Sequence, residues 1–310
     1  MSVAPNFRSA NASASRGDTS QIRRPPGTRD MVNARLSESV KRFTYRPEVI
    51  ALAGRLHLRS ILRRGYFWWA CPKDGIVRAT LAGAEVQFNV HSPEELRLIE
   101  STGGAGGEQR VLERLASRLD PGDVVWDVGA NVGLYTVVLA KRVGEEGLVI
   151  AFEPSSRAFA SLLDNLKLNH LANVRCFPLA LGEGKGQAEL YSDEVIGGAS
   201  LLSTPHQTGA AEVVNIVAGD CWRADENIPV PRAVKIDVEG YEWAVIRGLR
   251  GTLAEPSCEL VCCEVHPARL PVEVRPEAIV DLLRSAGFTR IDAYARWDKT
   301  FHLVACKRSS

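Results

Sequence analysis

Ten residues from Val124 to Gly133, Val-Val-Trp-Asp-Val-Gly-Ala-Asn-Val-Gly, decide the fold of this chain. The first five are mostly β-branched or aromatic and suit a buried parallel strand, which needs no polar alternation. Gly129 and Gly133 bracket a tight turn, and the apolar spacing that follows predicts a helix over 134–143. A strand, a glycine turn and a helix N-terminus together direct backbone N–H groups and a partial positive charge towards a ligand.

A carboxylate follows this turn at a spacing that suits a nucleoside-containing cofactor. Glu153 ends the next apolar run, Leu148 to Phe152, about twenty residues after the turn. There a carboxylate can accept hydrogen bonds from both hydroxyls of a ribose. The glycine turn alone is weak evidence, but the turn together with this acid predicts a cofactor site at the edge of a sheet.

The composition is that of an ordinary globular protein of 310 residues, 45% hydrophobic and 24% charged. No run of about 18 apolar residues is present, so the sequence predicts no transmembrane segment. The first residues lack the apolar core of a signal peptide, and the seven cysteines form no CxxC pair and no Cys/His ligand set. We therefore expect buried free thiols and a cytoplasmic location.

Charge is distributed unevenly along the chain. Residues 1–46 carry nine Arg or Lys against Asp18, Asp30 and Glu38, a net charge of +6, whereas the whole chain carries +1. The remainder, at −5 by difference, is not a basic nucleic-acid-binding surface. Residues 1–44 are also poor in large apolar side chains, which predicts a disordered basic arm. Such an arm could contact acidic partners or a membrane surface, or have no role.

Residues 45–107 are expected to form a helix and a small β flap that cap the acceptor site, ahead of a catalytic domain over 108–310. Apolar spacing predicts a helix over 47–64 and strands over 66–71, 76–81 and 84–90. Trp68 and Trp69 could line the acceptor site, but neighbouring strand residues face opposite ways, so at least one is expected to pack in the core. A glycine-rich stretch then leads into a helix that begins at Glu108, either as a lid or as a simple connector.

From Gly122 onward the pattern alternates between strands and helices. We expect strands over 124–128, 148–152, 174–181, 188–191, 213–218, 233–237 and 259–265, and helices over 134–143, 156–169, 241–249 and 276–286. The last strands, 289–294 and 302–306, can only form an antiparallel hairpin. The sequence thus predicts an α/β fold with a doubly wound, mostly parallel seven-stranded sheet and a C-terminal antiparallel hairpin. By analogy of fold, that hairpin favours S-adenosylmethionine (SAM) methyltransferases over dehydrogenases.

Ligands of open α/β sheets collect at the carboxyl ends of the strands. In chain order, the residues at the expected ends are Asp127, Gly129 and Asn131, then Glu153 and Ser155, then Ala180 and Leu181, then Asp237 and Glu239, then Glu264 and His266. Polar groups stand at nearly every strand end, which a purely structural sheet does not need. We predict the active site at this edge.

These motifs resemble those of the FkbM family of SAM-dependent methyltransferases. The resemblance rests on Asp127-Val-Gly-Ala-Asn-Val-Gly133, Phe152-Glu-Pro154, Lys235-Ile-Asp-Val-Glu-Gly240 followed by Glu242, and Glu264, and it covers residues 92–306 approximately. It implies a Rossmann-like methyltransferase fold, SAM as the cofactor, and O-methylation of hydroxyls on sugars or polyketide-type natural products. It also implies a cofactor loop of Gly129, Asn131 and Gly133, a ribose-binding acid at Glu153, and a fourth-strand acidic motif of Asp237 and Glu239.

The chemistry of SAM agrees with these residues. A glycine turn lets the backbone approach the aminocarboxypropyl end, Asp127 can bind the ammonium, and Glu153 can bind the ribose diol. The backbone at Ala180 and Leu181 is placed to contact the adenine edge. Ser155 and Glu108 complete the predicted cofactor-binding set, although an acid that opens a helix is also favoured by the helix dipole alone.

Methyl transfer to a hydroxyl needs alignment and the removal of a proton. The candidates for the base are Asp237, Glu239, Glu264 and His266; a histidine titrates in the right range but is also a common structural residue after a strand. Two carboxylates as close as Asp237 and Glu239 would raise one pKa unless a cation lies between them. Their alternative role is an N-cap for the helix over 241–249. Their spacing does not support a divalent metal site, and we predict none.

The sequence leaves three functions open. The leading prediction is a SAM-dependent O-methyltransferase acting on a small-molecule or glycan acceptor, a hydroxyl of a sugar, glycolipid or natural product. Nucleic acid is not an expected partner, because Lys235-Ile-Asp-Val replaces the Asn-Pro-Pro-Tyr segment of enzymes that methylate exocyclic base nitrogens. The second is a nicotinamide-dependent oxidoreductase, although Asn131 stands where its fingerprint needs glycine. The third is a catalytically silent SAM-binding protein.

Overall fold

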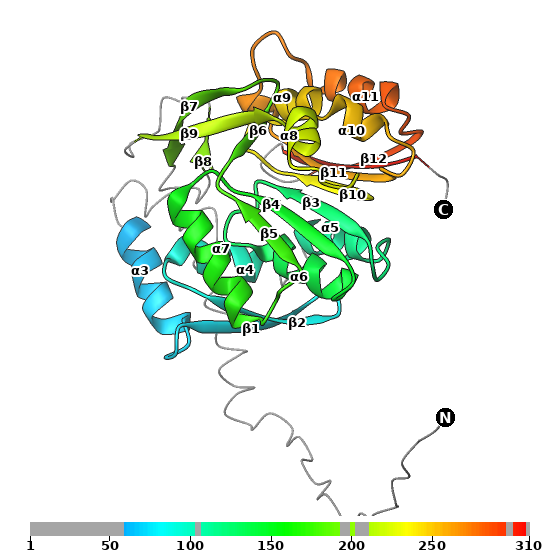
Figure 1. Cartoon of the computed structure of the whole chain (residues 1–310). Coiled ribbons are helices and arrows are strands. Elements are labelled where there is room, and N and C mark those ends of the chain that lie inside the picture. The colour runs from blue at the N-terminus through cyan, green and yellow to red at the C-terminus, as the bar shows by residue number, and fades with distance from the viewer. Residues whose placement is uncertain (1–58, 103–106, 193–198, 202–210, 296–299, 308–310) are drawn as a thin grey trace, which may run out of the picture. The chain divides into compact units, whose positions relative to one another are not determined.

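The computed structural model describes residues 59–102, 107–192, 199–201, 211–295 and 300–307. The chain divides into two compact units, residues 1–62 and residues 63–310. The predicted basic arm over 1–44 and most of the predicted helix over 47–64 lie outside the described residues. The second unit contains the α/β fold (Figure 1).

A seven-stranded sheet forms the centre of the second unit. Its strands, in spatial order, are β12 (Arg290–Ala295), β13 (Phe301–Cys306), β11 (Leu260–Val265), β10 (Ala233–Ile236), β3 (Val124–Val128), β4 (Leu148–Phe152) and β5 (Val174–Phe177). β13 is antiparallel to both of its neighbours, and the pairings from β11 through β10, β3 and β4 to β5 are parallel. The predicted mostly parallel sheet with a C-terminal antiparallel hairpin is confirmed.

Helices cover both faces of this sheet because successive strand residues belong to two different hydrophobic cores. In β3, Val125 packs in the first core, whereas Trp126 and Val128 pack in the second. The first core contains α4 (Pro93–Thr102), α5 (Gly107–Ala116), α6 (Leu134–Val143) and α7 (Ser156–Leu168). The second contains α8 (Gly219–Asp225), α9 (Glu242–Gly248), α10 (Arg250–Ala254) and α11 (Pro276–Ser285). The doubly wound architecture is therefore confirmed as well.

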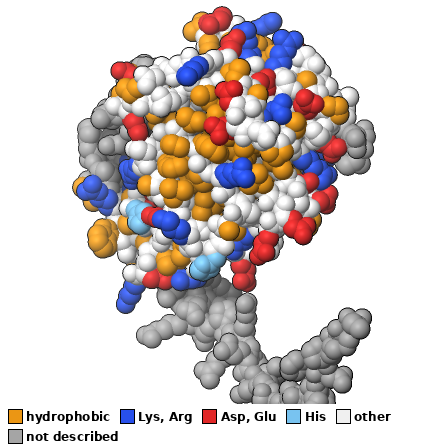
Figure 2. All heavy atoms as spheres, in the orientation of Figure 1, with side chains coloured by type: hydrophobic (Ala, Val, Ile, Leu, Met, Phe, Trp, Pro, Cys, Tyr) orange, Lys and Arg blue, Asp and Glu red, His pale blue; other side chains and the backbone are white. Residues whose placement is uncertain are grey.

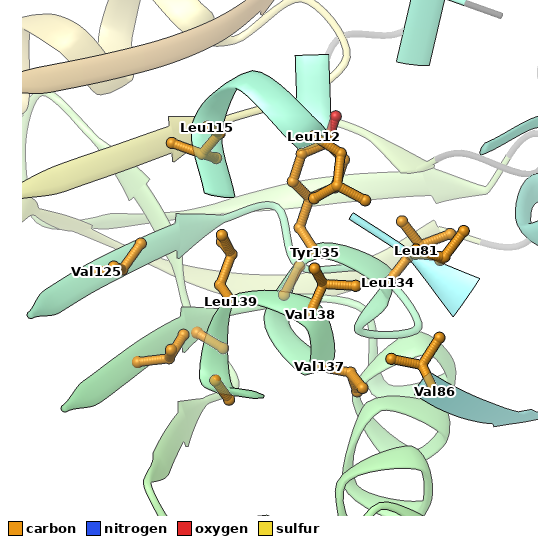
Figure 3. Packing of buried hydrophobic residues seen from close by; sticks show 14 of the residues in the cluster. Leu81, Val86, Leu112, Leu115, Val125, Leu134, Tyr135, Val137, Val138 and Leu139 are labelled. Carbon is orange, nitrogen blue, oxygen red and sulfur yellow. The ribbon is translucent and has the colours of Figure 1, made fainter. Parts of the chain in front are cut away.

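Helix α6, which follows the glycine turn, is enclosed in the first core. Figure 3 shows apolar side chains of α6 facing Leu112 and Leu115 of α5, and Leu81 and Val86 of the hairpin described next. Eight of its ten residues are buried, which is why its sequence has almost no polar face. The N-terminus of α6 is consequently held in a fixed position at the edge of the sheet.

A two-stranded antiparallel sheet, β1 (Ile76–Leu81) and β2 (Ala84–Asn89), confirms two of the predicted flap strands. Two asparagines of the α7 region fasten it. Asn169 Oδ1 accepts a hydrogen bond from the Gln87 N–H (3.0 Å), and Asn165 Oδ1 accepts one from the Asn89 N–H (2.8 Å). The hairpin shares the first core with α6 and α7, and its role as a cap over the acceptor stays a prediction.

The predicted strand over 66–71 is wrong, because its first five residues end the helix α3 (Arg59–Ala70). The aromatic run favours a strand by propensity, but Tyr66, Phe67 and Ala70 pack against the first core at helical spacing. Trp68 is 83% exposed and Trp69 is 52% exposed, so the expectation that one of them packs in the core is also wrong.

The predicted single strand over 174–181 is divided between two sheets. Pro178, which cannot donate a ladder hydrogen bond, follows β5, and the chain leaves the large sheet there. A smaller sheet then forms in the order β6 (Ala180–Gly182), β9 (Ala211–Ala218), β7 (Gly186–Ser192) and β8 (Ala199–Ser200). Periodicity along the chain predicts these strands but does not say which sheet each one joins.

The remaining expectations concern membranes and thiols. Among the described residues, none of the helices has the length and apolarity needed to cross a bilayer. All seven cysteines are free, and Cys258, Cys262, Cys263 and Cys306 are buried, as predicted.

Candidate active site

The carboxyl ends of four neighbouring strands bring the predicted site residues to one edge of the large sheet. β3 pairs with β4 on one side and with β10 on the other, and β11 follows β10. The chain reaches β10 only after it has formed β5, the smaller sheet and α8, so the strand order reverses at β3. Open α/β sheets bind ligands at such a reversal. Asp127, Glu153, Asp237 and Glu264 stand at or next to these four ends.

The glycine turn has the tight conformation that its sequence predicts. Gly129, Asn131 and Gly133 adopt positive φ angles of 78°, 51° and 90°. A Cβ on Gly129 would lie 1.8 Å from the backbone oxygen of Asp237, so only glycine fits between the ends of β3 and β10. This close approach joins the turn directly to the acidic motif.

The N-terminus of α6 is available to an anion. Its N-cap is Gly133, which supplies no side-chain hydrogen bond to the first N–H groups of this ten-residue helix. Uncapped N–H groups and the helix dipole favour a negatively charged ligand. A carboxylate of an amino-acid-like ligand fits this position.

Glu153 lies beside the turn in the position expected of a ribose-binding acid. Its Oε2 accepts a hydrogen bond from the Asn131 N–H (2.7 Å) and its Oε1 accepts one from the Ser155 N–H (2.8 Å). The residue is 6% exposed, and burial raises the pKa of its carboxyl to about 7 against the opposing effect of these hydrogen bonds. Each oxygen keeps a further lone pair for a diol. The Ser155 side chain caps α7 by accepting from the Ala158 N–H.

Asp127 is fully buried and both of its carboxylate oxygens have partners. Thr136 Oγ1 donates to Oδ2 (2.6 Å), and Lys235 Nζ lies 3.1 Å from Oδ1. Lys235 also donates to the Gly129 carbonyl (2.7 Å) and lies 5.2 Å from the centre of the Tyr135 ring. Burial opposes the charge of this ammonium, but Asp127 and Asp237 outweigh it and raise its pKa. The contact of Asp127 with the cofactor ammonium stays a prediction.

Two cationic side chains lie beside Glu239, and they offset the repulsion between its carboxylate and that of Asp237. His266 Nε2 lies 3.3 Å and Arg269 Nη1 lies 2.5 Å from Oε2 of Glu239. On its other side, His266 Nδ1 lies 2.7 Å from Oε1 of the fully buried Glu242. Burial lowers the pKa of His266, but the bond to Glu242 and the charge of Glu239 raise it to about 10. His266 is therefore a cation at neutral pH.

Asp237 differs from its acidic neighbours. Its carboxylate makes no hydrogen bond to any part of the chain that the structure describes, and Lys235 Nζ is 3.8 Å away. Burial and the charge of Glu264 raise its pKa to about 7, while Lys235 acts in the opposite direction. The alternative role as an N-cap is not seen, because the N-cap of α9 is Tyr241 and that helix end has no side-chain cap.

A second group of polar side chains lies on β11, β13 and α5. His302 is the register partner of Glu264, and its Nε2 lies 3.3 Å from Glu264 Oε2. Thr300 Oγ1 donates to Glu264 Oε1 (3.2 Å). Glu108 accepts from the Tyr135 hydroxyl (2.8 Å) and lies 3.8 Å from His302 Nε2. Glu108 thus reaches the same edge as Glu264, and its role in binding the cofactor stays a prediction.

Ala180 and Leu181 lie in β6 of the smaller sheet, and both are buried. Leu181 packs in the second core, while the Glu153 N–H donates to the Phe177 carbonyl at the start of the connection to β6. β6 therefore begins shortly after β5, the strand whose Phe177 carbonyl accepts the hydrogen bond from the Glu153 N–H. Its contact with adenine stays a prediction.

Two groups of side chains could each offer three ligand atoms to a metal ion, with the atoms within 4.8 Å of one another. The first group is Asp237, Glu239 and His266, and the second is Glu108, Glu264 and His302. In the first group, Arg269 already pairs with Glu239, and His266 is held as a cation between two carboxylates. A metal ion would have to displace both charges, and the expectation of a site without metal stays a prediction.

Comparison with known proteins assigns the family. The profile of the family described as Methyltransferase FkbM domain matches residues 127–290, more than half of the chain. The chain belongs to the FkbM methyltransferase family. The resemblance read from the motifs is confirmed, and the matched region begins at Asp127, in the strand that precedes the glycine turn.

Two curated relatives extend the FkbM comparison. A hexuronic acid methyltransferase, AglP, of Haloferax volcanii is 28% identical over 225 residues, which cover 70% of this chain and 85% of the relative. A 31-O-demethyl-FK506 methyltransferase of Streptomyces tacrolimicus is 28% identical over 236 residues, covering 65% and 86%. Among solved structures, a SAM-dependent methyltransferase from Aquifex aeolicus aligns with 15% identity and a TM-score of 0.39, over 70% of this chain and all of that one.

FkbM membership makes the chain a methyltransferase with SAM as its cofactor, and the oxidoreductase alternative is therefore wrong. The residues present fit this cofactor. Glu153 keeps lone pairs for the ribose diol, the uncapped N-terminus of α6 suits the carboxylate, and Gly129 lets the backbone come close. When bound, SAM supplies a methyl group activated by a sulfonium.

The residues that sequence reasoning missed are partners of those it found. Lys235 lies in the quoted FkbM motif and Glu242 directly follows it, but no role was predicted for either. The feature that could have marked them is a charged residue beside a buried strand. Arg269, His302 and Thr136 come from other elements, and no local pattern marks them. Packing of α6 against the sheet brings Thr136 to the site, and the placement of β11 and β13 brings Arg269 and His302.

Proposed function

We propose that this FkbM-family protein is a SAM-dependent O-methyltransferase whose acceptor is a hydroxyl of a sugar, glycolipid or other natural product. The relatives support this class, because one is named for a hexuronic acid and the other for a 31-O position. The chain spans more than four fifths of the length of each of these relatives.

The observation that carries the proposal is the state of Asp237. Glu239 and Glu264 are engaged by His266, Arg269 and Thr300, whereas the carboxylate of Asp237 has no hydrogen bond within the described residues. A general base needs an unengaged acceptor atom and a pKa near the working pH. Asp237 has both, since its pKa is raised to about 7.

In this proposal, Asp237 accepts the proton of the acceptor hydroxyl while the turn at Gly129 holds the cofactor next to it. The backbone oxygen of Asp237 faces Gly129 so closely that base and cofactor turn share one rigid junction. Alignment of this kind is a main source of acceleration in a transfer that needs little further activation. His266 and Arg269 keep Glu239 paired, so Glu239 competes less with Asp237 for the proton of the acceptor.

The charge of the site favours a neutral hydroxyl over a carboxylate as the acceptor. Glu239 and Glu264 lie near the proposed base Asp237, and burial together with the charge of Glu264 already shifts the pKa of Asp237 upward. A further carboxylate beside them would meet like charge, which costs binding free energy in a buried site.

Two wider assignments belong to the same proposal. Residues 45–107 act as the acceptor cap of a catalytic domain over 108–310; in support, the β1–β2 hairpin shares the first core with α6, whose N-terminus lies at the site edge. The reaction takes place in the cytoplasm, which suits a chain whose seven cysteines are all free thiols.

Methyl transfer from labelled SAM to extracts of the producing cell, followed by isolation of the labelled product, tests the proposal. The label is expected in a methyl ether that survives mild base; label released by mild base would identify an ester and overturn the hydroxyl assignment. Asp237→Asn should lower turnover by about 10²- to 10⁴-fold with SAM affinity nearly unchanged. The exposed Asp281→Asn is the matched control. Wild-type turnover in Asp237→Asn would remove the base assignment.

A further inference from the structure

The loops that follow β10 and β11 are pressed against each other. A Cβ on Gly240 would lie 2.6 Å from Cβ of Arg269 and 2.8 Å from its backbone oxygen, so the two segments leave no room for a side chain there. Glu239 and Gly240 both have left-handed φ angles, 53° and 108°. A residue other than glycine in this conformation is strained, and such residues concentrate at functional sites because surrounding contacts hold them in place.

Glu242, the first residue of α9, connects these two loops through a buried carboxylate. Its Oε1 accepts a hydrogen bond from the Gly240 N–H (2.8 Å) and lies 2.7 Å from His266 Nδ1. Acidic and basic side chains are spread over the face that Figure 2 shows, where water solvates them, whereas Glu242 is fully buried. Its Oε2 has no hydrogen-bond partner in the described part of the chain. A carboxylate buried in this way is costly, which indicates a role beyond starting a helix.

The contacts of His266 fix the protonation of its ring. Nδ1 faces Glu242, and Nε2 lies 3.3 Å from Oε2 of Glu239. Because an ionised carboxylate can only accept hydrogen bonds, each ring nitrogen needs a proton, and the ring is an imidazolium. A neutral ring would place a lone pair against one of the two carboxylates. Glu242 therefore fixes both the orientation and the charge of the ring.

This imidazolium lies next to the proposed base. One carboxylate oxygen of Asp237, one of Glu239 and one ring nitrogen of His266 all lie within 4.8 Å of one another. At such a distance a positive charge favours the deprotonated form of a carboxyl group. The ring thus favours a charged Asp237 while it pairs with Glu239, the competing carboxylate.

Several elements contribute the charged and titratable groups around this pair. Those that act most on Asp237 are Glu264 of β11, Lys235 of β10, Glu239 and His266, and it is also faced by Tyr135 of α6, Cys262 and Cys263 of β11, and His302 of β13. The carboxylates around the His266 ring are Glu242, Glu239, Asp237 and Glu264. Of the groups that act most on Asp237, Lys235 and His266 favour its deprotonated form, and Glu264 and Glu239 oppose it.

We propose that Glu242 is a positioning residue for methyl transfer, which acts through the His266 ring to hold Glu239 and to leave Asp237 as the base. This inference rests on the proposed function, because it takes Asp237 to be the base. Glu242 lies behind the ring and needs no contact with the acceptor or with SAM for this role.

Three variants test the proposal. Glu242→Gln keeps an oxygen that can accept from the Gly240 N–H and from His266 but removes the charge, His266→Gln removes the cation, and the third variant combines both. Glu277→Gln, at an exposed acid in the first turn of α11, is the matched control. Calorimetry with SAM and thermal unfolding check that each variant keeps its fold.

The readout is the initial rate of methyl transfer from labelled SAM to a limiting amount of extract of the producing cell. It is measured between about pH 6 and pH 9. SAM is kept saturating at each pH, so that the protonation of Glu153 does not enter the profile. NMR titration of His266 accompanies the rates.

His266→Gln is expected to move the acid limb of the rate profile, set by the pKa of Asp237 at about 7, upward by about one pH unit. The rate at pH 7 then falls about fivefold and recovers at pH 9, which a loss of folded protein would not do. Glu242→Gln should move the limb in the same direction by less, and its imidazole should lose the proton at least about one pH unit below that of the wild type. The double variant should match His266→Gln alone, because Glu242 acts through the ring.

An additive loss in the double variant would show that Glu242 acts on its loop directly, and it would overturn the proposal. An unmoved acid limb in His266→Gln would overturn it as well, and that measurement holds even if Glu242→Gln does not fold. Asp237→Asn separates this inference from the proposed function. Retained turnover in Asp237→Asn overturns the base itself, whereas lost turnover there with unmoved limbs in the other variants overturns the role of Glu242 alone.

Discussion

The ammonium nitrogen of Lys235 lies 3.1 Å from Oδ1 of Asp127, and the two residues are register partners in the parallel pair of β10 and β3. Both side chains are buried, at 6% and 0% exposure. Because Lys235 also donates to the Gly129 carbonyl, one buried ion pair joins the strand of the proposed base to the cofactor turn. The proposed SAM site therefore depends on a contact between two strands that are about a hundred residues apart in sequence.

Replacing Lys235 by Met should destabilise the protein and weaken SAM binding together. Removal of one partner of a buried ion pair leaves an uncompensated charge, here on Asp127, at a cost of about 3–5 kcal/mol in the free energy of unfolding. Urea unfolding and calorimetry with SAM measure the two effects. Lys167→Met, which breaks an exposed pair with Asp164, is the control and should cost less than about 0.5 kcal/mol. Equal effects of the two substitutions would refute the anchoring role.

Gly129→Ala should be far more harmful than Gly122→Ala. Both glycines have left-handed φ angles, 78° and 91°, so each alanine costs about 1 kcal/mol in backbone strain. Only at Gly129 does the added Cβ collide, 1.8 Å from the Asp237 oxygen, whereas nothing lies within 4 Å at Gly122. We expect Gly129→Ala to abolish SAM binding while Gly122→Ala keeps it, as measured by calorimetry. Retained affinity in Gly129→Ala would show that the junction can open.

The affinity for SAM should fall as the pH decreases below about 7. The charged carboxylate of Glu153 accepts the ribose hydroxyls in our proposal, and its pKa is raised to about 7, so protonation at lower pH removes the acceptor. The dissociation constant is then constant above pH 7 and rises by up to about tenfold per pH unit below it. Glu153→Gln should bind weakly at every pH and lose this dependence. Asp237→Asn, the control, should keep it.

The positive charge of His266 should contribute stability at neutral pH. Its pKa is raised to about 10 in the folded protein from a usual value of 6.5. The stabilisation is therefore complete below pH 6.5 and is lost as the pH rises through about 10. The difference in unfolding free energy between wild type and His266→Gln should shrink over that range, and NMR titration should find the imidazole protonated at pH 8. The exposed His91→Gln is the control. An imidazole that is neutral at pH 8 would contradict the pairing with Glu242.

The amino-acid sequence by itself determined the order of the elements and the residues at the strand ends. The apolar runs at β3 and β4, the glycine turn and the acids at 127, 153, 237 and 264 are all local patterns, and hydrophobic burial makes such patterns reliable guides to strands. They are also sufficient to indicate the FkbM family and SAM. The aromatic run at 66–70 misled, because intrinsic propensity favours a strand there while contact with the first core selects a helix.

Only the tertiary structure decided which charges neutralise one another. Arg269, His302 and Lys235 meet their carboxylate partners through sheet register and a crossover, and no spacing along the chain encodes those meetings. The engagement of Glu239 and Glu264 in turn separates Asp237 from the other candidate bases. The physical reason is that a pKa depends on burial and on charges within a few ångströms, which are properties of the folded chain.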